Sequence, residues 1–285
     1  MTAAAPSRLV VQGADIATPT LKKLARLADA SRIDALSRGS AQAFSLEPVS
    51  DTTGIAACCA QASLDWAIVP FEQRLDRVRL VAMDMDSTLI TIECIDEIAG
   101  MQGIKHEVAA ITASAMRGEI DFRQSLERRL ALLAGLDAAA LQRVYDERLE
   151  LSPGAERLLA AMRANGAQSL LVSGGFTFFT ERLKARLGLD HTCANTLEIV
   201  DGKLTGRLVG PLVDAGVKAE CFARLRASLA GEDGLAVAIG DGANDLPMLE
   251  RADVSVAYHA KPVVRERTTY AVDHCGLDAV LNLFV

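Results

Sequence analysis

The sequence has 285 residues, enough for one large or two modest domains. Half of the residues are hydrophobic, but only 4% are aromatic, and no apolar run approaches the roughly 20 residues that cross a bilayer. The formal net charge is −7, and no dense block of Lys and Arg occurs. These totals argue against nucleic acid and membranes as partners.

Six cysteines are scattered along the chain, two of them adjacent at Cys58 and Cys59, and no CxxC motif occurs. This distribution argues against a disulfide framework or a zinc site and favours free thiols in a reducing cytosol. The first residues lack a charged leader followed by a long apolar core, which is the pattern of a secretory signal. We therefore expect a cytoplasmic protein.

Residues 1–75 are expected to form a small α+β domain, because short strand and helix patterns alternate there. The expected strands and helices cover residues 8–12, 20–30, 42–46, 53–62 and 66–69. This part holds no cluster of Asp, Glu, His or Cys that could carry out chemistry. A packing or dimerisation domain therefore explains it at least as well as a sensor of small molecules.

Residues 76–285 are expected to form a second domain that begins with an apolar strand at residues 80–83. The pattern is then helical up to residue 168. Helices are predicted at residues 105–116, from Asp121 as N-cap to about residue 133, and at 137–149. Helices inserted between the first two strands of an α/β core would form a cap at about residues 94–150.

From residue 169 onward, strand and helix signals alternate. Strands are predicted at 169–173, 235–240, 254–258 and 270–273, helices at 176–187, 217–229 and 244–251, and a hairpin at 196–208. The pair Asp201-Gly202 marks the turn of that hairpin. Repeated strand-then-helix units predict an α/β fold with a doubly wound, mainly parallel sheet.

The strand at residues 80–83 ends on two aspartates, Asp84 and Asp86. Residues two apart on an extended chain point the same way, so both carboxylates can face one spot beyond the strand. Ligands of α/β sheets bind at that end. Two adjacent acids favour a hard cation such as Mg²⁺ as a third partner, and a carboxylate held in this way can attack phosphorus.

Either aspartate alone would be read as part of an acidic turn. The string DMDST after an apolar strand, however, is motif I of the haloacid dehalogenase-like hydrolases. The longer DMDSTLITIECIDEIAG resembles the phosphoserine phosphatase branch of that superfamily. The resemblance covers roughly residues 79–285, and it implies an α/β core with an inserted helical cap.

Three further segments match the family in chain order. Ser173-Gly174-Gly175 resembles motif II, whose hydroxyl and backbone N–H groups can hold phosphate oxygens. Lys218 would offset charge in the transition state; without the resemblance it reads as a solvated side chain. The string GDGAND, residues 240–245, resembles the motif that supplies further Mg²⁺ ligands.

The resemblance also implies roles for the acidic residues. Mg²⁺ would be held by Asp84, by the backbone carbonyl of Asp86 and by Asp241. Asn244 and Asp245 would support the site, with Asp245 either near the metal or orienting Lys218. Asp84 would attack phosphorus while Asp86 donates a proton to the departing alkoxide, and Asp86 would then take a proton from the hydrolytic water.

Substrate selection is expected to come from the cap. Glu93 is a candidate for binding an ammonium group, and Arg129 for binding a carboxylate through two parallel hydrogen bonds. Phe122 and Arg129 fall on one stripe of the predicted helix, so Arg129 can face a pocket or lie on the surface. The segment AMRGEIDFRQSLERRL resembles the family's cap, in which residues matching Met116, Phe122 and Arg129 line the substrate pocket.

The activity implied by the resemblance is Mg²⁺-dependent hydrolysis of a small phosphoester, phosphoserine, as the last step of serine synthesis. Three alternatives stay open: hydrolysis of another small phosphomonoester, phosphoryl transfer to an alcohol such as homoserine, and serine sensing by a vestigial core. Similar phosphatases often carry a regulatory domain of the ACT type before the core, and residues 1–75 are compatible with one. A homodimer could form through that domain.

Overall fold

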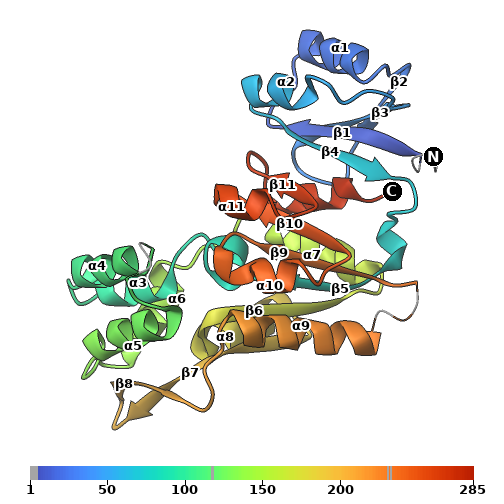
Figure 1. The fold of residues 1–285 in the computed structure, drawn as a ribbon. Coiled ribbons are helices and arrows are strands. Elements are labelled where there is room, and N and C mark those ends of the chain that lie inside the picture. The colour runs from blue at the N-terminus through green and yellow to red at the C-terminus, as the bar shows by residue number, and fades with distance from the viewer. Residues whose placement is uncertain (1–5, 117–118, 230, 232) are drawn as a thin grey trace.

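The computed structural model describes residues 6–116, 119–229, 231 and 233–285, without the side chain of Met116. Two β-sheets form its framework (Figure 1): a four-stranded sheet near the N-terminus and a seven-stranded sheet that the rest of the chain builds. In the part of the chain that is described, no helix is long and apolar enough to cross a membrane.

The N-terminal unit has the order β-α-β-β-α-β. Its elements are β1 (Ser7–Gly13), α1 (Thr18–Leu27), β2 (Arg32–Leu36), β3 (Gln42–Glu47), α2 (Ile55–Gln61) and β4 (Asp65–Pro70). The sheet order is β2-β3-β1-β4 with every neighbouring pair antiparallel, the ferredoxin-like arrangement. Both helices cover one face of this sheet (Figure 1). Strand β2 was not predicted, because its exposed residues lack a clear apolar alternation.

The second sheet has the order β11-β10-β9-β5-β6-β7-β8. Its strands are β5 (Val78–Met83), β6 (Gln168–Phe176), β7 (His191–Val200), β8 (Lys203–Val209), β9 (Leu235–Gly240), β10 (Val254–Tyr258) and β11 (Tyr270–Val272). All neighbours are parallel except the β7–β8 hairpin. The predicted fold class, a doubly wound and mainly parallel sheet, is therefore confirmed.

Helices cover both faces of this sheet, so its central strands are buried on two sides. Along β5, Leu80 and Ala82 belong to one apolar cluster, whereas Val81 and Met83 belong to the other. The covering helices are α7 (Ala155–Ala164), α8 (Thr177–Leu187), α9 (Ala215–Leu229), α10 (Leu246–Leu249) and α11 (Pro262–Arg265). A strand buried on both faces reads as a continuous apolar run, which is why β5 could be predicted.

Of the five α-helices described between β5 and β6, the first four gather at one side of the sheet (Figure 1). They are α3 (Cys94–Gly100), α4 (Lys105–Met116), α5 (Phe122–Leu132) and α6 (Ala139–Glu147). The predicted N-cap is present, since the Asp121 carboxylate accepts a hydrogen bond from the Gln124 N–H at 2.8 Å. These helices form the cap expected from the sequence.

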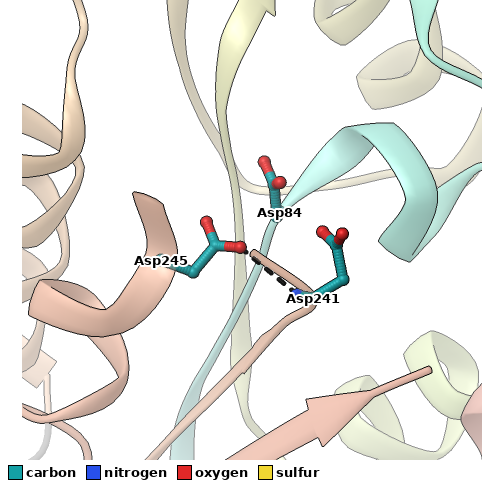
Figure 2. Close-up of side chains that lie close together, drawn as sticks. All are labelled: Asp84, Asp241 and Asp245. Carbon is teal, nitrogen blue, oxygen red and sulfur yellow. Dashed lines mark hydrogen bonds between the residues drawn. The ribbon is translucent and has the colours of Figure 1, made fainter. Parts of the chain in front are cut away.

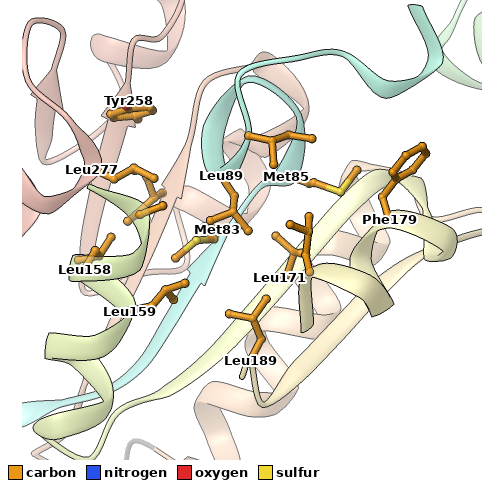
Figure 3. Packing of buried hydrophobic residues seen from close by; sticks show 14 of the residues in the cluster. Met83, Met85, Leu89, Leu158, Leu159, Leu171, Phe179, Leu189, Tyr258 and Leu277 are labelled. Atoms are coloured by element: carbon orange, nitrogen blue, oxygen red, sulfur yellow. The ribbon is translucent and has the colours of Figure 1, made fainter. Parts of the chain in front are cut away.

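The larger apolar cluster surrounds the base of the strand that carries the aspartates. Figure 3 shows Met83, Met85 and Leu89 packed among side chains from α7, α8 and the end of the chain. Each such side chain contributes roughly 1.5–3 kcal/mol when it is fully buried. Asp84 and Asp86, which follow β5, are therefore attached to a tightly packed strand end.

The N-terminal sheet is fixed to the C-terminal end of the chain. The Asp65 carboxylate on β4 accepts hydrogen bonds from the backbone N–H groups of Asp273 at 2.7 Å, His274 at 3.1 Å and Cys275 at 3.0 Å. Arg8 donates to the Phe284 carbonyl at 2.8 Å. The predicted division after residue 75 lies between the two sheets, and independent folding of the two parts stays a prediction.

Two predicted elements differ in detail. The helix predicted at residues 244–251 is a 3₁₀ turn, Ala243–Asp245, followed by the short α10. The last segment, Leu277–Leu283, is also 3₁₀. The predicted hairpin is present and longer than expected, because β7 begins at His191, where it pairs in parallel with β6.

Candidate active site

Two aspartates meet at the C-terminal end of β5. Asp84 is only 5% exposed, and its N–H donates to the Ile239 carbonyl at 3.1 Å. The chain then turns sharply, with Ser87 in the left-handed region at φ 57°. The turn brings Asp86 into the same cavity, where its carboxylate accepts a hydrogen bond from the Cys94 N–H at 3.1 Å.

A lysine joins these acids from α9. Lys218 is 1% exposed, and its ammonium lies 2.7 Å from Asp84 Oδ1 and 2.9 Å from Asp245 Oδ1. A buried ammonium is tolerated only when it is paired and hydrogen-bonded. The two carboxylates therefore hold the Lys218 ammonium beside Asp84.

Three carboxylates meet at the acidic end of the cavity, where Asp84 and Asp241 line it and Asp245 lies directly behind it. Figure 2 shows Asp84, Asp241 and Asp245 around one spot, and one oxygen of each lies within 4.8 Å of the others. Asp245 also accepts hydrogen bonds from the N–H groups of Asp241 at 3.2 Å and Gly242 at 3.0 Å. A Cβ on Gly240 would lie 2.7 Å from Asp245, so glycine is required there.

This donor set suits a hard divalent cation. Carboxylate oxygens are the ligands that Mg²⁺ and Ca²⁺ prefer, and three of them converge here from two strand ends. Asp245 accepts hydrogen bonds from Lys218 and two backbone N–H groups, whereas the hydrogen bond described for Asp241 is a long one, 3.3 Å, from Thr88. Of the three carboxylates, Asp241 is therefore the one without a bond to Lys218 among the described hydrogen bonds.

The end of β6 brings backbone close to the acids. Ser173 is buried, and its Oγ accepts a hydrogen bond from the Gly175 N–H at 2.8 Å. A Cβ on Gly175 would lie 2.9 Å from Asp86 Oδ2, and one on Gly174 would lie 3.3 Å from the Phe122 ring. These glycines let the chain pass between Asp86 and the cap.

Asn195 on β7 supports this segment and was missed by the sequence interpretation. Its side chain is buried; Nδ2 donates to the Gly174 carbonyl at 2.8 Å, and Oδ1 accepts from the Val213 N–H at 2.8 Å. Asn195 thus ties the Gly174 segment to the chain that leads into α9 and Lys218. A single asparagine just before the predicted hairpin gave no signal of this role.

The cap supplies the other wall of a cavity of about 310 Å³. Glu93, Phe122 and Arg129 all line it, as predicted, and the Ser87 hydroxyl donates to Glu93 at 2.8 Å. Arg129 is held by a hydrogen bond from its Nε to the Ser125 carbonyl at 3.4 Å. The predicted role of the Met116 side chain lies outside the described residues.

Several cavity residues were not predicted. They are Ile95, Asp96, Thr112, Leu126, Phe176 and Lys261; Gly175 and Gly242 also line the cavity and lie within the predicted motifs. Asp96 reads as a solvated position of a helix, although its charge interacts with Arg129 inside the cavity. Lys261 could have been found, because it follows the C-terminal end of β10, and strand ends of this kind meet at the site.

Burial shapes the acidity of the site. Burial and the neighbouring Glu93 carboxylate raise the pKa of Asp86 to about 7. Burial and Asp245 raise the pKa of Asp241 to about 6 and also raise that of Asp84, which Lys218 opposes. Burial lowers the pKa of Arg129, and Asp96 works against that change. Asp86 can therefore hold or release a proton near neutral pH.

Of the predicted site residues whose side chains are described, all but Asp245 line this cavity. They are Asp84, Asp86, Glu93, Phe122, Arg129, Ser173, Gly174, Lys218, Asp241 and Asn244. Asp245 lies directly behind it, 0% exposed, where it receives Lys218 and the Asn244 amide at 3.3 Å. At one end of the cavity lie the aspartates, Lys218 and the backbone at the end of β6. At the other end lie Glu93 and Arg129.

Comparison with known proteins identifies the class. A family model described as haloacid dehalogenase-like hydrolase matches residues 81–250. The chain belongs to the haloacid dehalogenase-like hydrolases. Within them it is similar to phosphoserine phosphatases: it is 52% identical to the one from Polaromonas sp. over 215 residues, 74% of this chain and 91% of that protein.

Solved structures share the whole architecture. A HAD family hydrolase from Salmonella enterica serovar Typhi superposes with a TM-score of 0.87 at 35% identity, covering 98% of both chains. A probable phosphoserine phosphatase from Vibrio cholerae gives a TM-score of 0.81 at 35% identity over 99% of this chain and 88% of that one. Both alignments include the N-terminal sheet.

A second family model matches residues 9–60 and is described as Domain of unknown function (DUF4072). It covers most of the N-terminal unit. The ACT-type assignment of this unit stays a prediction.

Proposed function

We propose that this protein hydrolyses O-phospho-L-serine to L-serine and phosphate, the final step of serine biosynthesis. The observation that carries the proposal is a single cavity with two chemically different ends. Asp84, Asp86 and Lys218 form one end, and Glu93 and Arg129 stand at the other. This arrangement suits a phosphate attached to a small zwitterion, and it occurs on a chain 52% identical to a phosphoserine phosphatase.

The reaction would proceed in two steps on Asp84. The Asp84 carboxylate attacks phosphorus, and Asp86 in its protonated form gives its proton to the departing serine oxygen. Asp86 then takes a proton from the water that hydrolyses the aspartyl phosphate. A pKa of about 7 suits this residue to both roles at neutral pH.

Fixed donors would neutralise the transferred phosphoryl group. Lys218 lies 2.7 Å from Asp84 and so places its charge next to the phosphorus under attack. The Ser173 hydroxyl and the backbone of Gly174 border the same part of the cavity. Asn195 would act as a positioning residue, because it holds the Gly174 carbonyl without lining the cavity.

The acidic end fits Mg²⁺, with Asp84, Asp241 and the backbone carbonyl of Asp86 as its proposed ligands. When bound, the ion would neutralise phosphate oxygens and so lower their repulsion toward the attacking carboxylate. Asp245 would hold the Lys218 ammonium and the Gly242 loop in place through its hydrogen bonds to both. Asn244 would support Asp245 through its amide.

The cap would select the amino acid. Glu93 pairs with the substrate ammonium, and Arg129 grips its carboxylate with two parallel hydrogen bonds. Phe122 would close the cavity over the substrate. Phe122 is suited to this because its ring already faces Gly174.

The test is phosphate release from L-phosphoserine with and without Mg²⁺, beside phosphothreonine and a panel of phosphosugars. We expect Mg²⁺-dependent release that is selective for phosphoserine and is lost in Asp84→Asn. Selective turnover of another ester would keep the mechanism but refute the roles of Glu93 and Arg129. A new phosphoester formed from an added alcohol, with little free phosphate, would indicate a transferase instead.

The scattered free cysteines favour a reducing compartment, and we propose the cytoplasm. A homodimer through the N-terminal sheet stays a prediction.

A further inference from the structure

Two cysteines from different elements touch beside the active site. Cys193 lies on β7 and Cys221 on α9, and their sulfur atoms are 2.8 Å apart. Two thiol sulfurs at this separation are closer than an ordinary van der Waals contact, and an S–S bond is about 2.05 Å long. Only a small movement therefore separates the thiols from a disulfide.

We propose that Cys193 and Cys221 form a redox site that closes to an intramolecular disulfide in the presence of hydrogen peroxide. The pair has two free thiols at rest, in keeping with a reducing compartment. Its closure would cross-link β7, which carries Asn195, to α9, which carries Lys218.

The two thiols have different environments, which assigns them different roles. The two thiols share one hydrogen bond, and the Cys221 sulfur also accepts one, at 3.6 Å, from Arg224 Nη2. The Cys193 thiol and the Arg224 guanidinium lower the pKa of Cys221 to about 6. Cys221 is therefore the attacking thiolate, and the more exposed Cys193 is the resolving thiol.

The chemistry balances with peroxide as the only oxidant. The Cys221 thiolate attacks one peroxide oxygen; an S–O bond forms, the O–O bond breaks, and hydroxide leaves as water after taking a proton. The Cys193 sulfur then attacks Cys221; an S–S bond forms, the S–O bond breaks, and the departing hydroxide takes the Cys193 proton. Two thiols and one peroxide give one disulfide and two waters, and an added dithiol reverses the oxidation.

The other cysteines offer a contrast. Burial raises the pKa of Cys59 to about 12 and also raises the pKa of Cys94 and Cys275. Cys58 and Cys59 are adjacent on α2 and buried in the N-terminal core. A buried thiol without a positive neighbour is a poor nucleophile. Peroxide should therefore select Cys221 and leave Cys58 and Cys59 reduced.

The first test needs no substitution. The full-length protein is treated with hydrogen peroxide, its remaining thiols are alkylated after unfolding, and the peptides are mapped by mass spectrometry. We expect one cross-linked pair containing Cys193 and Cys221, lighter by two hydrogen atoms and reversed by dithiothreitol. Separate sulfinic acids at the two positions, or a cross-link between other cysteines, would overturn the proposal.

A second test uses stability. Closing a loop of this length should raise the Tm of oxidised wild type by roughly 5–10 °C over the reduced protein. Cys193→Ser and Cys221→Ser should show no such shift, whereas the control Cys58→Ser should keep it. A cross-link that lowers the Tm would contradict the inference that the reduced fold already holds the two sulfurs in bonding position.

Discussion

At the scale of single residues, the site depends on groups that never touch the substrate. Asn195 is the clearest case, because both ends of its buried amide are used, one on the Gly174 carbonyl and one on the Val213 N–H. Removing such a group leaves a buried donor and acceptor unpaired, which costs about 1–3 kcal/mol. That cost would act directly on the Gly174 segment, which lines the cavity.

We therefore expect Asn195→Ala to lower kcat/KM for phosphoserine about tenfold or more. Asn195→Asp keeps an acceptor for Val213 but cannot donate to Gly174, so it should recover stability more than activity. Asn165→Ala is the matched control, since the hydrogen bond described for the Asn165 amide stays within its own helix end, to the Ala161 carbonyl. Equal losses of stability and activity in both Asn195 variants would reduce Asn195 to a purely structural residue.

The raised pKa values in the aspartate cluster predict how metal binding depends on pH. Burial and Asp245 raise the pKa of Asp241 to about 6, so this carboxyl takes up a proton as the pH falls through 6. A protonated ligand competes with a cation, and metal affinity falls accordingly. The rise in Tm that Mg²⁺ produces should therefore be small at pH 5 and grow up to pH 7.5, as scanning fluorimetry can measure.

The same carboxyl affects the metal-free protein in the opposite direction. A folded-state pKa above the unfolded value means that the folded protein binds more protons between about pH 4 and 6. The contribution of Asp241 to stability is thus lost as the pH rises through that range. Asp241→Asn should remove this loss and abolish the Mg²⁺-dependent Tm shift; a shift that persisted would exclude Asp241 as a ligand.

At the scale of elements, the end of β6 shows why two neighbouring glycines differ. A Cβ at Gly175 would meet Asp86 Oδ2 and Met85 Cε at 2.9 Å, and neither can move without disturbing the site. A Cβ at Gly174 would meet the Phe122 ring at 3.3 Å, and Phe122 is 39% exposed and free to shift. We expect Gly175→Ala to reduce kcat/KM about 100-fold or more and Gly174→Ala about tenfold or less. Steady-state kinetics would contradict this if the order were reversed.

The elements also show what sequence can predict. Strands β9 and β10 lie at the predicted residues, because strands buried on both faces are continuous apolar runs. Strand β2 was missed because its side chains are largely exposed. The Asp121 capping box was predictable because its two residues are close in sequence.

The residues of the site also divide into those that the local sequence can predict and those that it cannot. Asp84, Asp86 and Asp241 were predictable from motifs at strand ends, where the topology of the sheet brings them together. Lys218 was predicted only through family resemblance. Asn195 and Asp96 depend on packing between distant segments, and their local sequence carries no sign of it.

At the scale of the whole molecule, Asp65 fastens the N-terminal sheet to the core. Its side chain is buried, with Asp65 only 4% exposed, and accepts hydrogen bonds from the backbone N–H groups of residues 273–275. Hydrogen bonds to a buried charge contribute about 1.5–3 kcal/mol, so Asp65→Ala should lower the Tm by roughly 5–10 °C. The exposed Asp15, on the same unit, provides the control Asp15→Ala. Equal Tm values for the two variants would contradict the role of Asp65.

The proposed function requires that the cavity bind the phosphate and the amino acid part of the substrate at the same time. Phosphoethanolamine, which keeps the ammonium but lacks the carboxylate, separates these contributions. The measurement is kcat/KM for L-phosphoserine and phosphoethanolamine in wild type and Arg129→Ala, with the exposed neighbour Arg128→Ala as control. We predict that Arg129→Ala loses about 100-fold on phosphoserine and little on phosphoethanolamine, because a bidentate charged contact disappears only for the first. Equal losses on both substrates, or a phosphoserine activity untouched by the change, would contradict the account.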